Sequence, residues 1–239
     1  GAIDHTDRVI INGRLKIDGF EQTIFTNQYT QDPNVDNQTD DYKITLKSYY
    51  TNIYGSDNDD FIYGGAGNDH ILGGAGNDII FGGSGNDYID GGSGNDTIST
   101  GDGNDTLSGG IGNDTLIISG EGNSTLDGGE GIDTFKIDLS NYTPPEGVTD
   151  FAYKADLSTG FVGSKYDPNH VNNDDIVNIE NIDYSGSYNA ELIGDKLDNV
   201  ISSGNGDDTI HGGAGDDIIK SGAGDDFIYG EAGDDVLIL

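Results

Sequence analysis

The residues of this chain whose types and spacing could do chemistry are aspartates that recur at every ninth position. Seven successive nine-residue units start at Gly55, and their sixth positions hold Asp60, Asp69, Asp78, Asp87, Asp96, Asp105 and Asp114. Later units repeat the pattern with Asp133, Asp208, Asp217, Asp226 and Asp235. Carboxylates in regular rows are oxygen ligands for a hard divalent cation such as calcium, which binds about 6–8 oxygens in flexible geometry.

A glycine-rich stretch precedes most of these aspartates, as in GGAGND over residues 64–69. Glycine tolerates positive φ and the close approach of neighbouring backbones, which a tight turn requires. Two stacked turns offer two carboxylates and also backbone carbonyl oxygens, which calcium accepts as well. The carbonyls predicted to bind are those of Gly64, Gly65, Gly67, Gly73, Gly74, Gly76, Gly82, Gly83, Gly85, Gly91, Gly92, Gly94, Gly212, Gly213 and Gly215.

The rest of each unit predicts the elements that position the aspartates. Position eight is apolar in all seven units, at Ile62, Ile71, Ile80, Ile89, Ile98, Leu107 and Leu116. A three-residue strand with this middle side chain inward, alternating with a turn, winds into a right-handed parallel coil of two units. Asp69 then stacks on Asp87 at a strand spacing of about 4.8 Å.

Such stacking is costly without a counter-ion. Two carboxylates about 5 Å apart repel by about 0.8 kcal/mol in water and by about 3 kcal/mol at an effective dielectric constant of about 20. The whole chain carries a net charge of −34, from 44 acidic and 10 basic residues. We therefore expect disorder in the metal-free chain and order once several calcium ions are bound.

Other metals and another calcium motif fit less well. Magnesium demands a stricter octahedron, and zinc prefers nitrogen or sulfur, whereas the chain has no cysteine and its histidines lack ligand spacing. An EF-hand could start at Asp32, but Asn37 stands where its glycine belongs and Lys43 where its bidentate glutamate belongs. Weaker calcium capture by this acidic loop remains an alternative, through Asp32, Asp36, Asp40 and Asp41.

Composition predicts an all-β chain in four segments. Residues 1–54 form an N-terminal β segment, 55–136 and 185–239 are repeat arrays, and 137–184 are an intervening β segment in which VTDFAYKADL alternates apolar and polar residues. The strong negative charge excludes nucleic-acid binding, and no apolar run is long enough to span a membrane. No residue constellation suggests catalysis, so we expect no enzyme in this chain.

The repeats resemble the GGxGxDxUx nonapeptide of the RTX (repeats-in-toxin) family of type I-secreted bacterial proteins. The resemblance covers residues 55–136 and 194–238, and its many copies make it specific. It implies a right-handed parallel β-roll, calcium-dependent folding, position-six carboxylate and turn-carbonyl ligands, and an extracellular or cell-surface location. It also implies export by the type I secretion machinery through an uncleaved signal, which we expect outside this chain because the pattern stops at DVLIL.

Three positions depart from the family pattern. Ser124, Ala190 and Asn199 stand where the ligand aspartate belongs. Calcium sites that use these turns are predicted to be weak or absent.

The role of the roll in its parent protein stays open at this point. One reading is a calcium-triggered folding and secretion module of a larger toxin, adhesin or exoenzyme. A second is an adhesin-type module that binds a glycan or a cell surface. A third is an ice-binding roll, because asparagines form outward rows at position five, although position three lacks threonine: Asn68, Asn77, Asn86, Asn95, Asn104 and Asn113.

An apolar patch on one sheet bears on the second reading. Phe61, Tyr63, Ile79 and Phe81 are predicted to point outward on adjacent coils. Either residues 1–54 fold back over the patch and cap the first coils, or the rings form a platform on which a sugar stacks.

Overall fold

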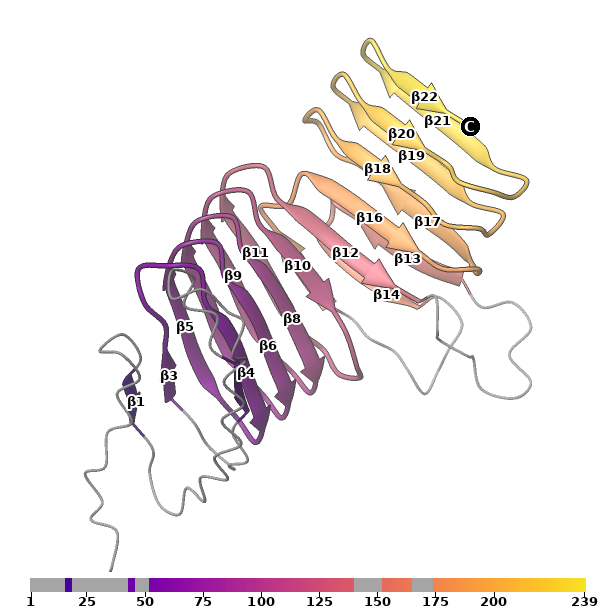
Figure 1. The fold of residues 1–239 in the computed structure, drawn as a ribbon. Helices are drawn as coiled ribbons and strands as arrows, with labels where there is room; N and C mark the ends of the chain where they lie inside the picture. Colours follow the sequence, from indigo (N-terminus) through magenta and orange to yellow (C-terminus); the bar gives the residue numbers. More distant parts are fainter. Residues whose placement is uncertain (1–15, 19–42, 46–51, 140–151, 165–173) are drawn as a thin grey trace, which may run out of the picture.

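The structure, a computed structural model, describes residues 16–18, 43–45, 52–139, 152–164 and 174–239. These residues form two sheets that face one another along an elongated roll (Figure 1), and none of them is in a helix. The chain alternates between the sheets, so strands two apart in sequence are neighbours throughout the first array. This is the parallel β-roll that the nine-residue periodicity predicts.

The larger sheet has 12 strands. In spatial order these are β1 (Lys16–Asp18), β3 (Asn52–Tyr54), β5 (His70–Ala75), β7 (Tyr88–Ser93), β9 (Thr106–Ile111), β11 (Thr125–Glu130), β15 (Asp174–Val177), β14 (Phe161–Ser164), β13 (Ala152–Asp156), β17 (Asn189–Ile193), β19 (Thr209–Ala214) and β21 (Phe227–Ala232).

The second sheet has 10 strands. Their order is β2 (Lys43–Thr45), β4 (Phe61–Ala66), β6 (Ile79–Ser84), β8 (Thr97–Asp102), β10 (Thr115–Ile118), β12 (Thr134–Asp138), β16 (Asn181–Ser185), β18 (Val200–Ser202), β20 (Ile218–Lys220) and β22 (Val236–Ile238).

Strands in the first array are longer than the three residues that the repeat predicts. β5 has six residues because its pairing with β7 continues past Leu72 into the glycines, where Gly74 lies opposite Gly92. For the units that start between Gly64 and Gly109, the first three residues therefore belong to the preceding strand, and the turn shrinks to the residues around the aspartate. The second glycine of the pair has a positive φ, 116° at Gly74, which bends the backbone there.

The core is a column of position-eight side chains between the sheets. Ile71 and Ile80 are fully buried, as is Leu126. At the C-terminal end the column is open, since Leu237 is 48% exposed, whereas Ile53 at the other end is 0% exposed. Stacking of successive coils thus buries the single large apolar residue of each unit.

The intervening segment enters the larger sheet as a hairpin. β13 and β14 pair antiparallel, and β14 also pairs antiparallel with β15. The alternation predicted for this segment is confirmed at Tyr153 and Ala155, both buried in β13. The segment therefore continues both sheets and joins the two arrays into one roll (Figure 1).

Near the N-terminus, β1 pairs with β3 and β2 with β4, so both sheets begin within residues 1–54. The predicted apolar patch is present on β4 and β6: the ring centroids of Phe61 and Phe81 are 5.7 Å apart, and Ile79 is exposed. The acidic loop at 32–41 lies outside the described residues, as does most of the segment predicted to cover the patch.

No helix in the described part of the chain is long and apolar enough to cross a membrane.

Candidate metal centre

The position-six aspartates lie in two rows, one beside the start of the strands of each sheet. In the larger sheet Asp69, Asp87 and Asp105 follow one another on successive coils, and each is at most 3% exposed. The row beside the smaller sheet contains Asp60, Asp78, Asp96, Asp114 and Asp133. The predicted stacking of Asp69 with Asp87 is confirmed, and Asp78 stacks with Asp96 in the same way.

One oxygen of each stacked carboxylate is used by the backbone. Oδ1 of Asp87 accepts a hydrogen bond from the backbone N–H of Asp69 at 2.8 Å, and Oδ1 of Asp96 accepts one from Asp78 at 2.7 Å. This contact recurs from coil to coil, so it fixes the direction of the carboxylates of Asp78, Asp87, Asp96, Asp105, Asp114 and Asp133. The side chains are held in place independently of any ion.

The other oxygen is buried without a hydrogen-bond partner. This holds for Oδ2 of Asp78, Asp87, Asp96, Asp105, Asp114, Asp133, Asp208 and Asp217. A buried carboxylate oxygen without a partner costs free energy unless it is protonated or meets a cation. A row of such oxygens is the arrangement that a series of bound cations would satisfy.

The pKa values of these carboxyl groups reflect the same environment. Burial raises the pKa of Asp78 and Asp87 to about 7, and neighbouring carboxylates of the row add to the effect, while the hydrogen bond from the backbone opposes it. Burial likewise raises the pKa of Asp105 and Asp114 to about 6. Without a cation, the roll holds these groups partly as the neutral acid near neutral pH.

Beside the first glycine of several turns, the unpartnered carboxylate oxygen and a carbonyl oxygen of the next coil border the same space. A Cβ added at Gly73 would lie 2.5 Å from Oδ2 of Asp78 and 2.5 Å from the carbonyl oxygen of Gly91 on the next coil. At Gly82 it would lie 2.6 Å from Oδ2 of Asp87. Glycine at these two positions leaves that space to the two oxygens, and oxygen donors of this kind fit calcium.

The other predicted carbonyls are placed differently. The carbonyl oxygens of position two lie against the backbone of the next coil; that of Gly65, for example, lies beside Gly83. The carbonyl oxygens of position four are placed in the same way, as that of Gly67 beside Gly85 shows. In the residues that the structure describes, no three His, Asp or Glu side chains form a metal-binding cluster. Any calcium site here must therefore combine few carboxylates with several backbone carbonyls.

The ends of the rows differ from their middle. Both the backbone N–H and the hydroxyl of Ser56 donate to Oδ2 of Asp60, so this oxygen already has partners. Asp226 and Asp235 are only half-buried on the last coil. They accept hydrogen bonds from the N–H groups of Asp208 and Asp217 on the preceding coil.

The positions that lack an aspartate replace the missing oxygen in different ways. Asn199 uses its amide within the fold: Oδ1 accepts from the N–H of Asp195, and Nδ2 donates to the carbonyl of Glu180. Ala190 offers no oxygen, although its N–H still donates to Oδ1 of Asp208. Ser124 and the neighbouring Asp105 also lack the first-position glycine, which is replaced by Ser119 and Thr100. The Thr100 hydroxyl donates to the carbonyl oxygen of Ser119 and accepts the N–H of Ser119.

Two acidic residues of the rows were not predicted from the sequence. Oδ1 of Asp174 accepts the N–H of Ser124 at 2.6 Å, and Oε2 of Glu180 accepts the N–H of Asp133 at 2.7 Å. Burial raises the pKa of Asp174 to about 7. The glycines that mark the other repeats are absent here, and the only remaining signal is DDIV, in which an acidic residue stands two places before an apolar one.

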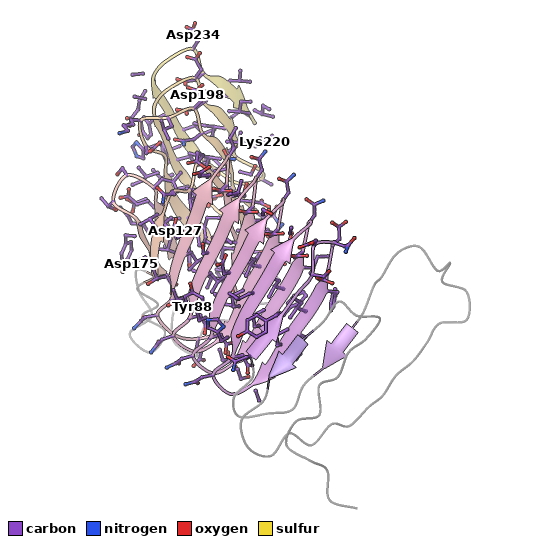
Figure 2. All side chains as sticks on the ribbon, turned by 90° about the vertical axis from the view of Figure 1, so that its left-hand side faces the viewer. Tyr88, Asp127, Asp175, Asp198, Lys220 and Asp234 are labelled. Atoms are coloured by element: carbon purple, nitrogen blue, oxygen red, sulfur yellow. The ribbon has the colours of Figure 1, made fainter. Side chains whose placement is uncertain are left out.

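The position-five side chains form separate, exposed ladders. Oδ1 of Asn68 accepts the N–H of Asn86 at 2.8 Å, and the second array uses aspartates in the same way, as Asp216 does for the N–H of Asp234. Figure 2 shows Asp198 and Asp234 on the outside of the turns of the second array. These carboxylates and amides stabilise the turns from outside, and both rows of position six remain inside.

Comparison with known families agrees with this geometry. A sequence model of the RTX calcium-binding nonapeptide repeat, built from four copies, matches residues 54–89, 81–116, 117–136, 184–219, 193–227 and 202–237, which together exceed half of the chain. No curated protein sequence matches the chain. With its repeats, its parallel roll and its buried carboxylate rows, the chain belongs to the RTX calcium-binding nonapeptide repeat family.

Proposed function

We propose that this chain is a calcium-triggered folding module: it stays largely unfolded without calcium and forms the roll when calcium fills the carboxylate rows. The observation that carries the proposal is the repeated, buried Oδ2 without a partner, next to a carbonyl oxygen of the following coil. At each turn the ion would be held by position-six carboxylates together with several backbone carbonyls of the stacked turns, among them that of the first position of the next coil. The proposal assigns no catalysis to the chain.

Linkage between folding and calcium supports this proposal. The oxygens converge only when two coils are stacked, so the unfolded chain has no preformed site, and the binding free energy becomes folding free energy. Extracellular calcium modules bind at about 10⁻⁴–10⁻³ M. Such a chain stays unfolded at the low calcium concentration inside a cell and folds outside, which suits a module that supports export and stability of a larger secreted bacterial protein.

Circular dichroism tests the proposal directly. In EDTA the spectrum should be that of a coil, and millimolar calcium should convert it to a β-sheet spectrum, whereas equal magnesium should not. A well-formed β spectrum in EDTA, or equal rescue by magnesium, would contradict the proposal.

Glycan binding is a second candidate, favoured by one groove. The rings of Tyr63 and Phe81, with centroids 6.4 Å apart, line a groove of about 250 Å³ together with Ser84, Ser99 and Asp102. Aromatic faces beside hydroxyl and carboxylate groups are a setting in which a neutral sugar stacks and donates hydrogen bonds. This function is supported if the wild-type chain binds neutral glycans, Phe81→Ser abolishes the binding, and Tyr88→Ser on the opposite sheet preserves it. If the wild-type chain binds no neutral glycan, glycan binding is excluded as its function.

A further inference from the structure

The start of β15 reproduces the backbone geometry of a repeat although its sequence lacks the glycines. The N–H of Asp175 donates to the carbonyl oxygen of Ser124 at 2.9 Å, as the N–H of Thr106 donates to that of Asp87 at 2.8 Å. Thr125 pairs with Asp175 and Leu126 with Ile176, which is buried like the position-eight residues. Asp174 therefore occupies position six of the coil that follows Ser124.

The side chain of Asp174 also has the environment of a position-six aspartate. It is 0% exposed, Oδ1 accepts the N–H of Ser124, and Oδ2 is buried without a partner. The neighbouring Asp175 instead points outward and is exposed (Figure 2). No ion pair joins Asp174 to a basic side chain of the described residues, so its charge lacks a partner within the parts of the chain that the structure describes.

We infer that Asp174 is a calcium ligand, supplied by the intervening segment, that extends the row of the larger sheet past Ser124. The inference rests on the proposed function and adds a residue that lies outside every matched repeat. A segment 50 residues farther along the chain thus contributes the carboxylate that Ser124 lacks. Calcium bound there would tie the intervening segment to the first array, so the whole roll would order together.

The variant Asp174→Asn separates a ligand from a structural residue. Asparagine keeps the Oδ1 that accepts the N–H of Ser124 but removes the charge. A purely structural Asp174 would then fold at equal or lower calcium, because a buried, unpaired charge has been removed. A ligand would fold at higher calcium and bind one ion fewer. Asp175→Asn is the matched control, since it removes the same charge from an exposed neighbour.

The experiment measures the calcium midpoint of folding by circular dichroism and the number of bound ions by isothermal titration calorimetry, with the full chain. We expect Asp174→Asn to raise the midpoint several-fold and lower the count by one, with Asp175→Asn close to wild type. A complete failure of Asp174→Asn to fold in calcium, with Asp175→Asn folding normally, also supports a ligand.

An unchanged or lower midpoint with an unchanged ion count overturns the assignment of Asp174. Asp87→Asn is the reference variant for a ligand within the repeats. It distinguishes a failure of the Asp174 assignment from a failure of the proposed function. Suppose that the wild type folds on calcium, that Asp87→Asn raises the calcium midpoint of folding, and that Asp174→Asn has the same midpoint as Asp175→Asn. Only the assignment of Asp174 then fails. If wild type does not respond to calcium, the proposed function fails with it.

Discussion

The carboxylate of Asp87 accepts the backbone N–H of Asp69 through Oδ1 and leaves Oδ2 buried and without a partner. The two residues are 18 positions apart in sequence and one coil apart in space. One side chain therefore connects adjacent coils through its first oxygen and presents the second to the calcium row. Stability and ion binding therefore depend on the same stacking of coils.

Interior aspartates should matter more than terminal ones. Asp87 contacts the coil before it, and its own N–H donates to Oδ1 of Asp105 on the coil after it, whereas Asp235 is linked only to Asp217. In a solenoid with nearest-neighbour interfaces, an interior loss breaks two interfaces. We expect Asp87→Ala to lower the cooperativity of calcium binding and the melting temperature in calcium far more than Asp235→Ala. Equal effects in a calcium titration would contradict shared, stacked sites.

Low pH should partly substitute for calcium in stabilising the folded roll. The pKa of Asp78 and Asp87 is about 7 in the metal-free roll, against an ordinary value of 3.8 in the unfolded chain. Between about pH 4 and 7 the folded state thus binds more protons, so its stability falls as pH rises through this window. In EDTA we expect more β structure at pH 5 than at pH 8, measured by circular dichroism with sedimentation to exclude aggregates. A coil spectrum at both pH values would count against these pKa shifts.

Calcium affinity should have the opposite pH dependence. Protons compete with calcium for the same carboxylates, and binding must release them. We expect the affinity measured by calorimetry to fall as pH decreases from about 7.5 to about 5.5, with proton release that varies with the buffer. A pH-independent affinity would argue that other groups bind the ion.

A methyl group at position one should intrude on a site, because it enters the space beside the carboxylate and the carbonyl oxygen of the next coil. Gly82 has no positive φ, so alanine fits its backbone, but its Cβ would lie 2.5 Å from the carbonyl oxygen of Thr100 and 2.6 Å from Oδ2 of Asp87. We expect Gly82→Ala to raise the calcium midpoint of folding several-fold. Ala75→Ser is the control, because serine already occupies the equivalent position at Ser84. Indistinguishable midpoints would place the ion elsewhere.

The N-terminal segment should shield the first coils. Ile53 is fully buried, whereas Leu237 at the opposite end is half exposed, and β1 and β2 extend both sheets beyond the first array. Deleting residues 1–50 should lower the melting temperature in calcium and create a site for a hydrophobic dye. An unchanged melt without dye binding would favour the open aromatic groove as the functional surface.

The sequence determined most of the roll because its signals are local and repeated. A glycine pair, an aspartate and an apolar residue at fixed positions specify a turn and an inward side chain, and a period of nine fixes which aspartates stack. The fold class and the rows of Asp78 and Asp87 follow from this alone. Strand length did not, because pairing between coils extends the ladder into residues that look like turn.

Only the tertiary structure decided what happens where the period breaks. Ser124 and Asp174 are far apart in sequence, and no local signal states that β15 will pair with β11. Likewise, Ser56 donates two hydrogen bonds to Oδ2 of Asp60, whereas Oδ2 of Asp78, at the same motif position, has no partner. The physical reason is that a ligand is defined by what surrounds its oxygens, and those neighbours come from the next coil rather than from the adjacent residues.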